Sequence, residues 1–324
     1  MIHRRAVAVI ATVLLTGLLA GLGACSATNA TPAAESSASA RTVTDPAGKT
    51  VEIPGNVRRA FGMYTSDLDY AITLGLPLAP VQSIREGSVG FPDFFPQEPL
   101  QGIEPLVNFP EFEYEKIAAA EPDVIINGLG YEGGPDGRKL AAIAPTFTYD
   151  GFDGDWRDDF KAVAAAFGKE QVAEAFLQQV SARTGEVKAK VAALGEAPTV
   201  AYGYYYPGGN GEFIGSAPDN LIGQVLAEVG IKPSKAVGKD WTEISHEKIP
   251  DLADVDLLMI AVDTDSDQDK VLAALRKDPI WSKLPAVKAG HVVAVNNELS
   301  YASPHAHLEF LDVLEPNLAL LASE

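Results

Sequence analysis

The sequence predicts an α/β fold in which two lobes are joined by one long helix. Short strand-like runs alternate with helix-like runs before and after residues 169–195, and this alternation is typical of parallel α/β sheets. Within that segment, apolar side chains from Ala173 to Leu194 recur at steps of three and four, which marks one helix face. At about 1.5 Å per residue the helix is roughly 40 Å long. We therefore expect a rigid connection between lobes; the alternative is an amphipathic helix inside a single domain.

Length and composition set the broad class of protein. A chain of 324 residues suggests about two domains, and 47% hydrophobic with 21% charged residues is an ordinary globular composition. The formal net charge of −19 disfavours nucleic acid as a partner, because like charges repel. The single cysteine, Cys25, excludes an internal disulfide.

The first residues have the layout of a signal peptide. Two arginines precede an uncharged, apolar or small-residue stretch over 6–21. Leu22 to Cys25 then resembles the lipobox of bacterial lipoproteins, which implies cleavage before Cys25 and diacylation of its sulfur. We therefore predict a signal peptide over 1–24 and a lipid anchor at Cys25, on the extracytoplasmic face of the cell membrane. The alternatives are an uncleaved signal anchor and a soluble secreted protein.

A flexible tether is expected after the lipidation site. Residues 26–40 are rich in Ser, Ala and Thr and almost lack large apolar side chains, so they cannot form a core. The predicted segments are a tether over 25–41, an N-terminal lobe over 42–167, an inter-lobe helix over 168–195 and a C-terminal lobe over 196–324.

The first lobe is expected to open with a β-hairpin. Asp45-Pro-Ala-Gly is a turn signal between strand-like runs at 41–44 and 50–53. Gly48-Lys49-Thr50 is not a phosphate loop, because that pattern needs Gly where Val43 stands. Further strands are expected at 59–63, 78–82, 123–127 and 146–149. Helices are expected at 66–74, 114–120, 138–143 and 156–167.

The second lobe repeats this alternation. Ser216 is expected to cap a helix that begins near Pro218, and Gly230 is expected to end it. The expected strands are 199–204, 213–214, 257–262 and 291–295. The other expected helices are 270–276 and a closing helix over 304–321.

One short string occurs in both lobes. Glu115-Lys-Ile precedes the buried strand that starts after Asp123, and Glu247-Lys-Ile precedes the one that starts after Asp256. In each lobe a short helix that begins with Glu-Lys-Ile leads into a buried strand. The two lobes therefore look like copies of one plan, although a three-residue string also recurs by chance.

Several stretches together resemble a known family. They are residues 43–54, 66–75, 114–126, 143–146, 155–159 and 284–293. With the lipobox, the tether and the joining helix, their order and spacing resemble the iron-siderophore and cobalamin class of ABC-importer substrate-binding proteins, over about 42–321. The resemblance implies two Rossmann-like α/β lobes, a ligand cleft between them and one backbone helix that limits hinge motion. It also implies a monomer without enzymatic activity or cofactor.

The resemblance further implies a membrane partner. In such proteins one glutamate on each lobe docks onto arginines of the ABC permease, and by position these are Glu115 and Glu247. Two exposed carboxylates held at a fixed distance suit a symmetric basic surface. The alternative is that both glutamates only oppose the macrodipole in the first turn of their helices.

Candidate ligand-binding residues follow from the rule that ligands of α/β sheets meet the carboxyl ends of strands. The candidates are Tyr64, Thr65, Arg85, Tyr131, Trp156, Tyr202, Tyr204, Tyr206, Phe213, Trp241 and Tyr301. The tyrosines suit a large ferric chelate, although an aromatic residue at a strand end also serves as core. Arg85 suits an anionic chelate, but the second lobe has few arginines before Arg276, which favours a hydroxamate or mixed siderophore.

Three other functions are weighed against siderophore capture. Haem or cobalamin would suit the same fold, with a tyrosine from 202–206 as the haem ligand. An extracytoplasmic metalloenzyme would use His305 and His307, but residues two apart lie on opposite sides of a helix. Asp263-x-Asp265-x-Asp267 imitates a calcium loop, yet the sixth and twelfth positions are Gln268 and Ala274. We therefore expect Asp267 or Ser266 to cap a helix, no resident metal and no enzyme.

Overall fold

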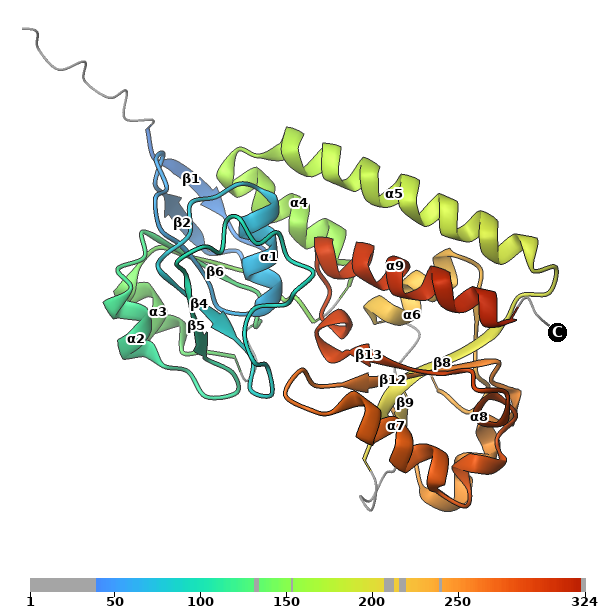
Figure 1. The fold of residues 1–324 in the computed structure, drawn as a ribbon. Coiled ribbons are helices and arrows are strands. Elements are labelled where there is room, and N and C mark those ends of the chain that lie inside the picture. The colour runs from blue at the N-terminus through green and yellow to red at the C-terminus, as the bar shows by residue number, and fades with distance from the viewer. Residues whose placement is uncertain are drawn as a thin grey trace, which may run out of the picture. The chain divides into compact units, whose positions relative to one another are not determined.

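The computed structural model describes residues 39–130, 134–152, 154–206, 213–215, 220–238 and 241–321 (Figure 1). The described residues form one compact unit. The predicted signal peptide, the lipidation site Cys25, most of the tether and the candidate Tyr131 lie outside the described residues. Among the described helices, none combines the length and the apolar character needed to cross a bilayer.

The N-terminal lobe contains the predicted hairpin and two small parallel sheets. The strands are β1 (Arg41–Thr44), β2 (Thr50–Ile53), β3 (Ala60–Gly62), β4 (Val81–Ile84), β5 (Glu104–Val107), β6 (Val124–Asn127) and β7 (Thr146–Thr148). β1 and β2 pair antiparallel, whereas β3-β6-β7 and β4-β5 are parallel. The helices are α1 (Thr65–Thr73), α2 (Tyr114–Ala119), α3 (Gly137–Ile143) and α4 (Trp156–Phe167).

The C-terminal lobe is built on one six-stranded, mostly parallel sheet with the order β11-β9-β8-β12-β13, and β10 pairs with β8. Its strands are β8 (Thr199–Tyr205), β9 (Phe213–Gly215), β10 (Lys232–Pro233), β11 (Thr242–Ile244), β12 (Leu257–Val262) and β13 (Val292–Asn296). Its helices are α6 (Leu221–Glu228), α7 (Gln268–Lys277), α8 (Pro285–Ala289) and α9 (Pro304–Leu321), with 3₁₀ turns η1 (His246–Asp254), η2 (Trp281–Lys283) and η3 (Asn297–Ser300). The mixture of parallel strands and helices confirms the predicted α/β class.

The long helix α5 (Glu170–Ala193) joins the two lobes, as predicted (Figure 1). Its fully buried residues, Ala173, Val180, Val187 and Val191, belong to the predicted apolar face. That face packs against α1 and α4 of the first lobe and against α6 and α9 of the second. One continuous helix therefore contacts helices of both lobes.

The repeated Glu-Lys-Ile string has the same structural setting in both lobes. In each, the isoleucine of the string is fully buried, and the Asp before the following strand receives a backbone N–H from the start of the neighbouring strand. Asp123 accepts from Arg59 at 3.1 Å, and Asp256 accepts from Thr199 at 2.7 Å. The strands that follow, β6 and β12, pair parallel with β3 and β8. The two lobes therefore share this local architecture.

Two elements begin several residues later than expected. The strand expected at 78–82 is β4 at Val81–Ile84, because Pro80 lacks an N–H and a strand extends more readily after it. Asn220 caps α6 by accepting the Gly223 N–H at 3.0 Å, so the helix begins at Leu221 rather than near Pro218. Ser216, expected as the cap, lies outside the described residues.

Candidate ligand cleft

A cleft of about 280 Å³ lies where residues of the two lobes meet. The N-terminal lobe contributes Tyr64, Ser66, Gly128, Gly151, Phe152, Gly154 and Trp156. The C-terminal lobe contributes Tyr204, Asn220, Leu221, Trp241, Ser300, Tyr301 and Ala302. Lining residues follow the carboxyl ends of β3, β6, β7 and β13, and Tyr204 is the next-to-last residue of β8. These are the places where α/β folds bind ligands.

Aromatic rings from both lobes form much of the cleft wall. The rings of Tyr64 and Tyr301 meet edge to face with centroids 5.1 Å apart, across the lobe boundary. Tyr204 stacks on Tyr206 at 5.9 Å with planes only 9° apart, and Tyr204 also lies 5.8 Å from Trp241. Trp241 and Tyr206 are each 49% exposed. Such half-exposed rings offer flat apolar surface to a ligand.

Local hydrogen bonding fixes the first-lobe side of this wall. Asp67, one turn into α1, accepts backbone N–H groups from Tyr64 at 3.0 Å and Gly128 at 3.1 Å, and the Tyr149 hydroxyl at 2.5 Å. A Cβ on Gly128 would lie only 2.5 Å from the Tyr149 ring, so glycine is required for this close approach. Burial raises the pKa of the Asp67 carboxyl to about 7. One buried carboxyl group thus joins two loops of the cleft.

Trp156 begins α4 at the cleft. Asp155 caps the helix by accepting the Arg157 N–H at 2.9 Å, which places Trp156 in the first turn. The Trp156 side chain is 2% exposed, and its indole N–H has no hydrogen-bond partner among the described residues. A buried donor without a partner is costly. It is therefore available to an acceptor on a bound molecule.

Arg85 lies beside the lining residue Tyr301 and is not itself among the residues that line the cleft. Its guanidinium group donates to Asp263 Oδ1 at 2.7 Å, to Glu298 Oε1 at 3.0 Å and to the Glu86 carbonyl at 2.7 Å. The arginine side chain is 10% exposed and the Glu298 side chain 2%. Its Cζ lies 5.4 Å from the centre of the Tyr301 ring. The positive charge expected for an anionic ligand is thus paired with two carboxylates.

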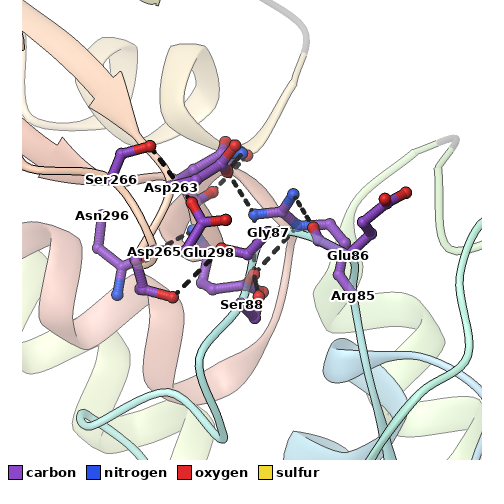
Figure 2. Close-up of polar contacts among 12 residues, drawn as sticks. Arg85, Glu86, Gly87, Ser88, Asp263, Asp265, Ser266, Asn296 and Glu298 are labelled. Carbon is purple, nitrogen blue, oxygen red and sulfur yellow. Dashed lines mark hydrogen bonds and ion pairs between the residues drawn. The ribbon is translucent and has the colours of Figure 1, made fainter.

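Neighbouring residues extend this contact between the lobes (Figure 2). The Ser88 hydroxyl donates to Glu298 Oε1 at 2.6 Å, and the Val89 N–H donates to the Thr264 hydroxyl at 3.0 Å. The Asp265 N–H donates to the Gly87 carbonyl at 3.3 Å. We call residues 85–89, 263–265 and Glu298 the inter-lobe clasp.

Three other candidates, Tyr202, Phe213 and Thr65, are buried and do not line the cleft. Tyr202 is buried in the core and packs edge to face on Phe310 of α9 at 6.5 Å. Phe213 is fully buried and packs on Trp281. Thr65 is buried at the start of α1, next to the lining residue Ser66. Neither Tyr202 nor Phe213 is among the described residues that line the cleft.

Glu115 and Glu247 are both exposed, in the first turns of α2 and of η1. The pKa of the Glu247 carboxyl is lowered because its own backbone N–H and the Ser245 hydroxyl donate to it. Both carboxylates are therefore accessible to a partner, and they occupy matching places in the repeated plan.

The histidines expected for a metalloenzyme do not share a site. His305 Nδ1 lies 2.5 Å from Asp69 Oδ1, whereas His307 Nε2 lies 3.2 Å from the Thr184 hydroxyl on α5. Burial lowers the pKa of His307 to about 3. In the described part of the chain, no group of three or more His, Cys, Asp or Glu residues could hold a metal ion.

The calcium alternative also lacks support, because Asp267 caps α7 by accepting the Lys270 N–H at 3.1 Å, as expected, and Asp263 pairs with Arg85. From the sequence, Asp263 is a candidate only for that imitation of a calcium loop, and Glu298, Phe152 and Ser300 are not among the candidates. Asp263 directly follows the buried strand β12. The strand-end rule would therefore have selected it.

Comparison with known proteins identifies the class. Residues 104–299 match the periplasmic binding protein family, and this match covers more than half of the chain. The chain therefore belongs to that family of transport-associated binding proteins, which confirms the predicted family and excludes the metalloenzyme alternative.

Individual relatives agree with this assignment. The chain is 27% identical over 294 residues to the probable siderophore-binding lipoprotein YfiY of Bacillus subtilis, covering 85% of this chain and 86% of the relative. It is 25% identical over 210 residues to the iron(3+)-hydroxamate-binding protein FhuD of Escherichia coli, covering 62% and 68%. A periplasmic solute binding protein of Mycobacterium smegmatis has the same fold, with a TM-score of 0.71, 24% identity and coverage of 88% and 99%.

Proposed function

We propose that this protein is a lipid-anchored receptor that captures a ferric siderophore, of hydroxamate or mixed type, and delivers it to an ABC importer. The observation that carries the proposal is the aromatic cleft between the lobes, whose described lining holds no charged side chain. A relative named as siderophore-binding and one named as hydroxamate-binding support the same substrate class.

The charge of the cleft favours hydroxamates over catecholates. A ferric tris-hydroxamate centre is neutral, whereas a ferric tris-catecholate centre carries three negative charges. The described lining offers no cation to compensate those charges, and Arg85 is already paired with Asp263 and Glu298. Burying uncompensated anionic charge is costly. The aromatic rings instead suit the apolar arms of a neutral chelate.

Haem is a weaker candidate for the same cleft. A tyrosine ligand to ferric haem coordinates as the phenolate. Burial raises the pKa of Tyr64, Tyr204 and Tyr301 above the ordinary value for tyrosine. The phenolate form is therefore disfavoured at these positions.

Delivery rests on the exposed glutamates and on the anchor. We propose that Glu115 and Glu247 dock onto arginines of the permease, one from each lobe, while the Cys25 lipid holds the protein at the membrane. Their matching environments and the continuous helix α5 support a fixed spacing between the two carboxylates. Because both are exposed, docking requires no unfolding of either lobe.

A fluorescence titration tests the proposal. The purified protein is titrated with ferrioxamine, ferrichrome, a ferric catecholate, haem and cobalamin while tryptophan and tyrosine emission is followed. Saturable quenching by a ferric hydroxamate at micromolar or tighter affinity is expected, because Trp241 and Tyr204 line the cleft. Tighter binding of the catecholate would overturn the hydroxamate assignment. A Soret band on haem addition together with no response to any ferric chelate would favour the haem rival.

A further inference from the structure

The inter-lobe clasp carries more negative than positive charge. Arg85 contributes one positive charge, and Asp263 and Glu298 contribute the two carboxylates that pair with it. Glu86 and Asp265 add two further carboxylates to the clasp. Only Oδ1 of Asp263 accepts the bonds from Arg85 and Asn297, each at 2.7 Å. The second carboxyl oxygen of Asp263 accepts none from the described residues, and the side chain is 39% exposed. The charge of Arg85 is therefore neutralised, and Asp263 keeps one solvent-accessible carboxylate oxygen.

A second unpaired oxygen lies in the same cluster. Glu298 is 2% exposed, and its Oε2 has no hydrogen-bond partner among the described residues. Oε1 of the same carboxylate already accepts from Arg85 and from the Ser88 hydroxyl. A buried carboxylate oxygen without a donor favours a nearby positive charge or N–H group.

This negative charge lies close to the aromatic wall of the cleft. Asp263 follows the carboxyl end of β12 and lies 2.7 Å from the Arg85 guanidinium group, whose Cζ is 5.4 Å from the centre of the Tyr301 ring. Burial raises the pKa of Tyr206 and Tyr301, and the Asp263 charge adds to this rise while the Arg85 charge opposes it. Tyr301 lines the cleft, and Tyr206 stacks on the lining residue Tyr204. Aromatic faces beside a carboxylate attract an ammonium group, through the ring quadrupole and through the charge.

We propose that the cleft selects ferric chelates that carry a protonated amine, and that Asp263 recognises this positive charge. The inference rests on the proposed function, since it concerns which siderophores the same cleft prefers. The chelate centre would contact the aromatic wall, and its amine would lie toward the clasp. A neutral chelate of the same shape would bind, but less tightly.

A pair of chelates that differ only in one charge tests this. Ferrioxamine B carries a free amine, and its N-acetylated derivative has the same iron centre and chain without that charge. We expect about two- to fivefold tighter binding of ferrioxamine B to the wild-type protein, the range for one partly exposed ion pair. The ratio should shrink as ionic strength rises, because salt screens exposed charges.

Three variants locate the effect. Asp263→Asn should lower the affinity for ferrioxamine B to that for the acetylated derivative, whereas Asp263→Glu, which keeps the charge, should retain a preference. Asp269→Asn is the matched control, because it removes an equal charge from an exposed position on α7, and it should keep the wild-type ratio.

The outcomes separate this inference from the proposed function. Equal affinity of the wild-type protein for both derivatives, or an unchanged ratio in Asp263→Asn, would overturn the amine selection while siderophore capture stands. If neither these derivatives nor any other ferric chelate binds, the proposed function fails and the selection fails with it.

Discussion

We predict that Arg85, the cation of the inter-lobe clasp, is important for the stability of the protein. Replacing Arg85 by Met removes the charge but keeps an apolar chain of similar length. Glu298 is then left as a buried, unpaired carboxylate with 2% of its side chain exposed. Removing one partner of a buried ion pair costs about 3–5 kcal/mol. Asp263 is 39% exposed, so loss of its pairing adds at most about 1 kcal/mol.

Urea unfolding followed by tryptophan fluorescence measures this cost, with the slope of the transition checked for constancy. The double variant Arg85→Met, Glu298→Gln should recover at least half of the loss, because the buried charge is gone and the Gln carbonyl can still accept from Ser88. Arg138→Met is the control, since Arg138 is 94% exposed and its solvent-screened pair with Asp136 should contribute little to stability. An Arg85→Met variant within about 1 kcal/mol of the wild type would refute the reasoning, as would a double variant no more stable than the single one.

Three further predictions concern the cleft and the docking residues. Asp67→Ala should destabilise by about 3 kcal/mol or more in urea unfolding, since three donors lose their acceptor. Burial raises the Asp67 pKa from 3.8 to about 7. The stabilisation by Asp67 is therefore complete below pH 3.8 and is lost as the pH rises through 7. Asp67→Asn should flatten this part of the pH profile of the unfolding free energy. Trp241→Ala should weaken chelate binding about tenfold without changing the unfolding midpoint, as titration and melting would check. Glu115→Gln with Glu247→Gln should abolish iron uptake by cells yet leave the chelate affinity of the purified protein unaltered; unimpaired uptake would contradict docking.

Elements with a complete local signal were predicted well from the sequence. α4, β12 and α9 have the expected bounds, because a helix period, a capping residue or a continuous apolar run marks each of them. The strands β5, β10 and β11 were not predicted. β10 has only two residues, one of them Pro233, and its pairing partner β8 lies far away in sequence. Such short edge strands form because of their neighbours, and little in their own sequence indicates them.

The candidate site was predicted less completely, for a geometric reason. The two-residue period of a strand places Tyr202 and Tyr204 on one face of β8. Periodicity does not determine how far along β8 a helix covers that face. Tyr202, earlier in β8, packs on Phe310 of α9, whereas Tyr204, one step from the strand end, reaches the cleft. Arg85 could be recognised as a cation, but its partners Asp263 and Glu298 lie 178 and 213 residues away along the chain.

The charged groups that we connect with function lie outside the lining of the cleft. The clasp holds Arg85 beside the cleft, between two carboxylates, so the lobes are joined by an ion pair and the described lining stays neutral. The two docking candidates, Glu115 and Glu247, are exposed at the starts of a helix and of a 3₁₀ turn, and are not among the residues that line the cleft. A chelate can therefore enter or leave without changing their ionisation. If the docking proposal holds, permease binding should depend strongly on salt, because it is an interaction of exposed charges, whereas binding of a neutral chelate should depend on it weakly.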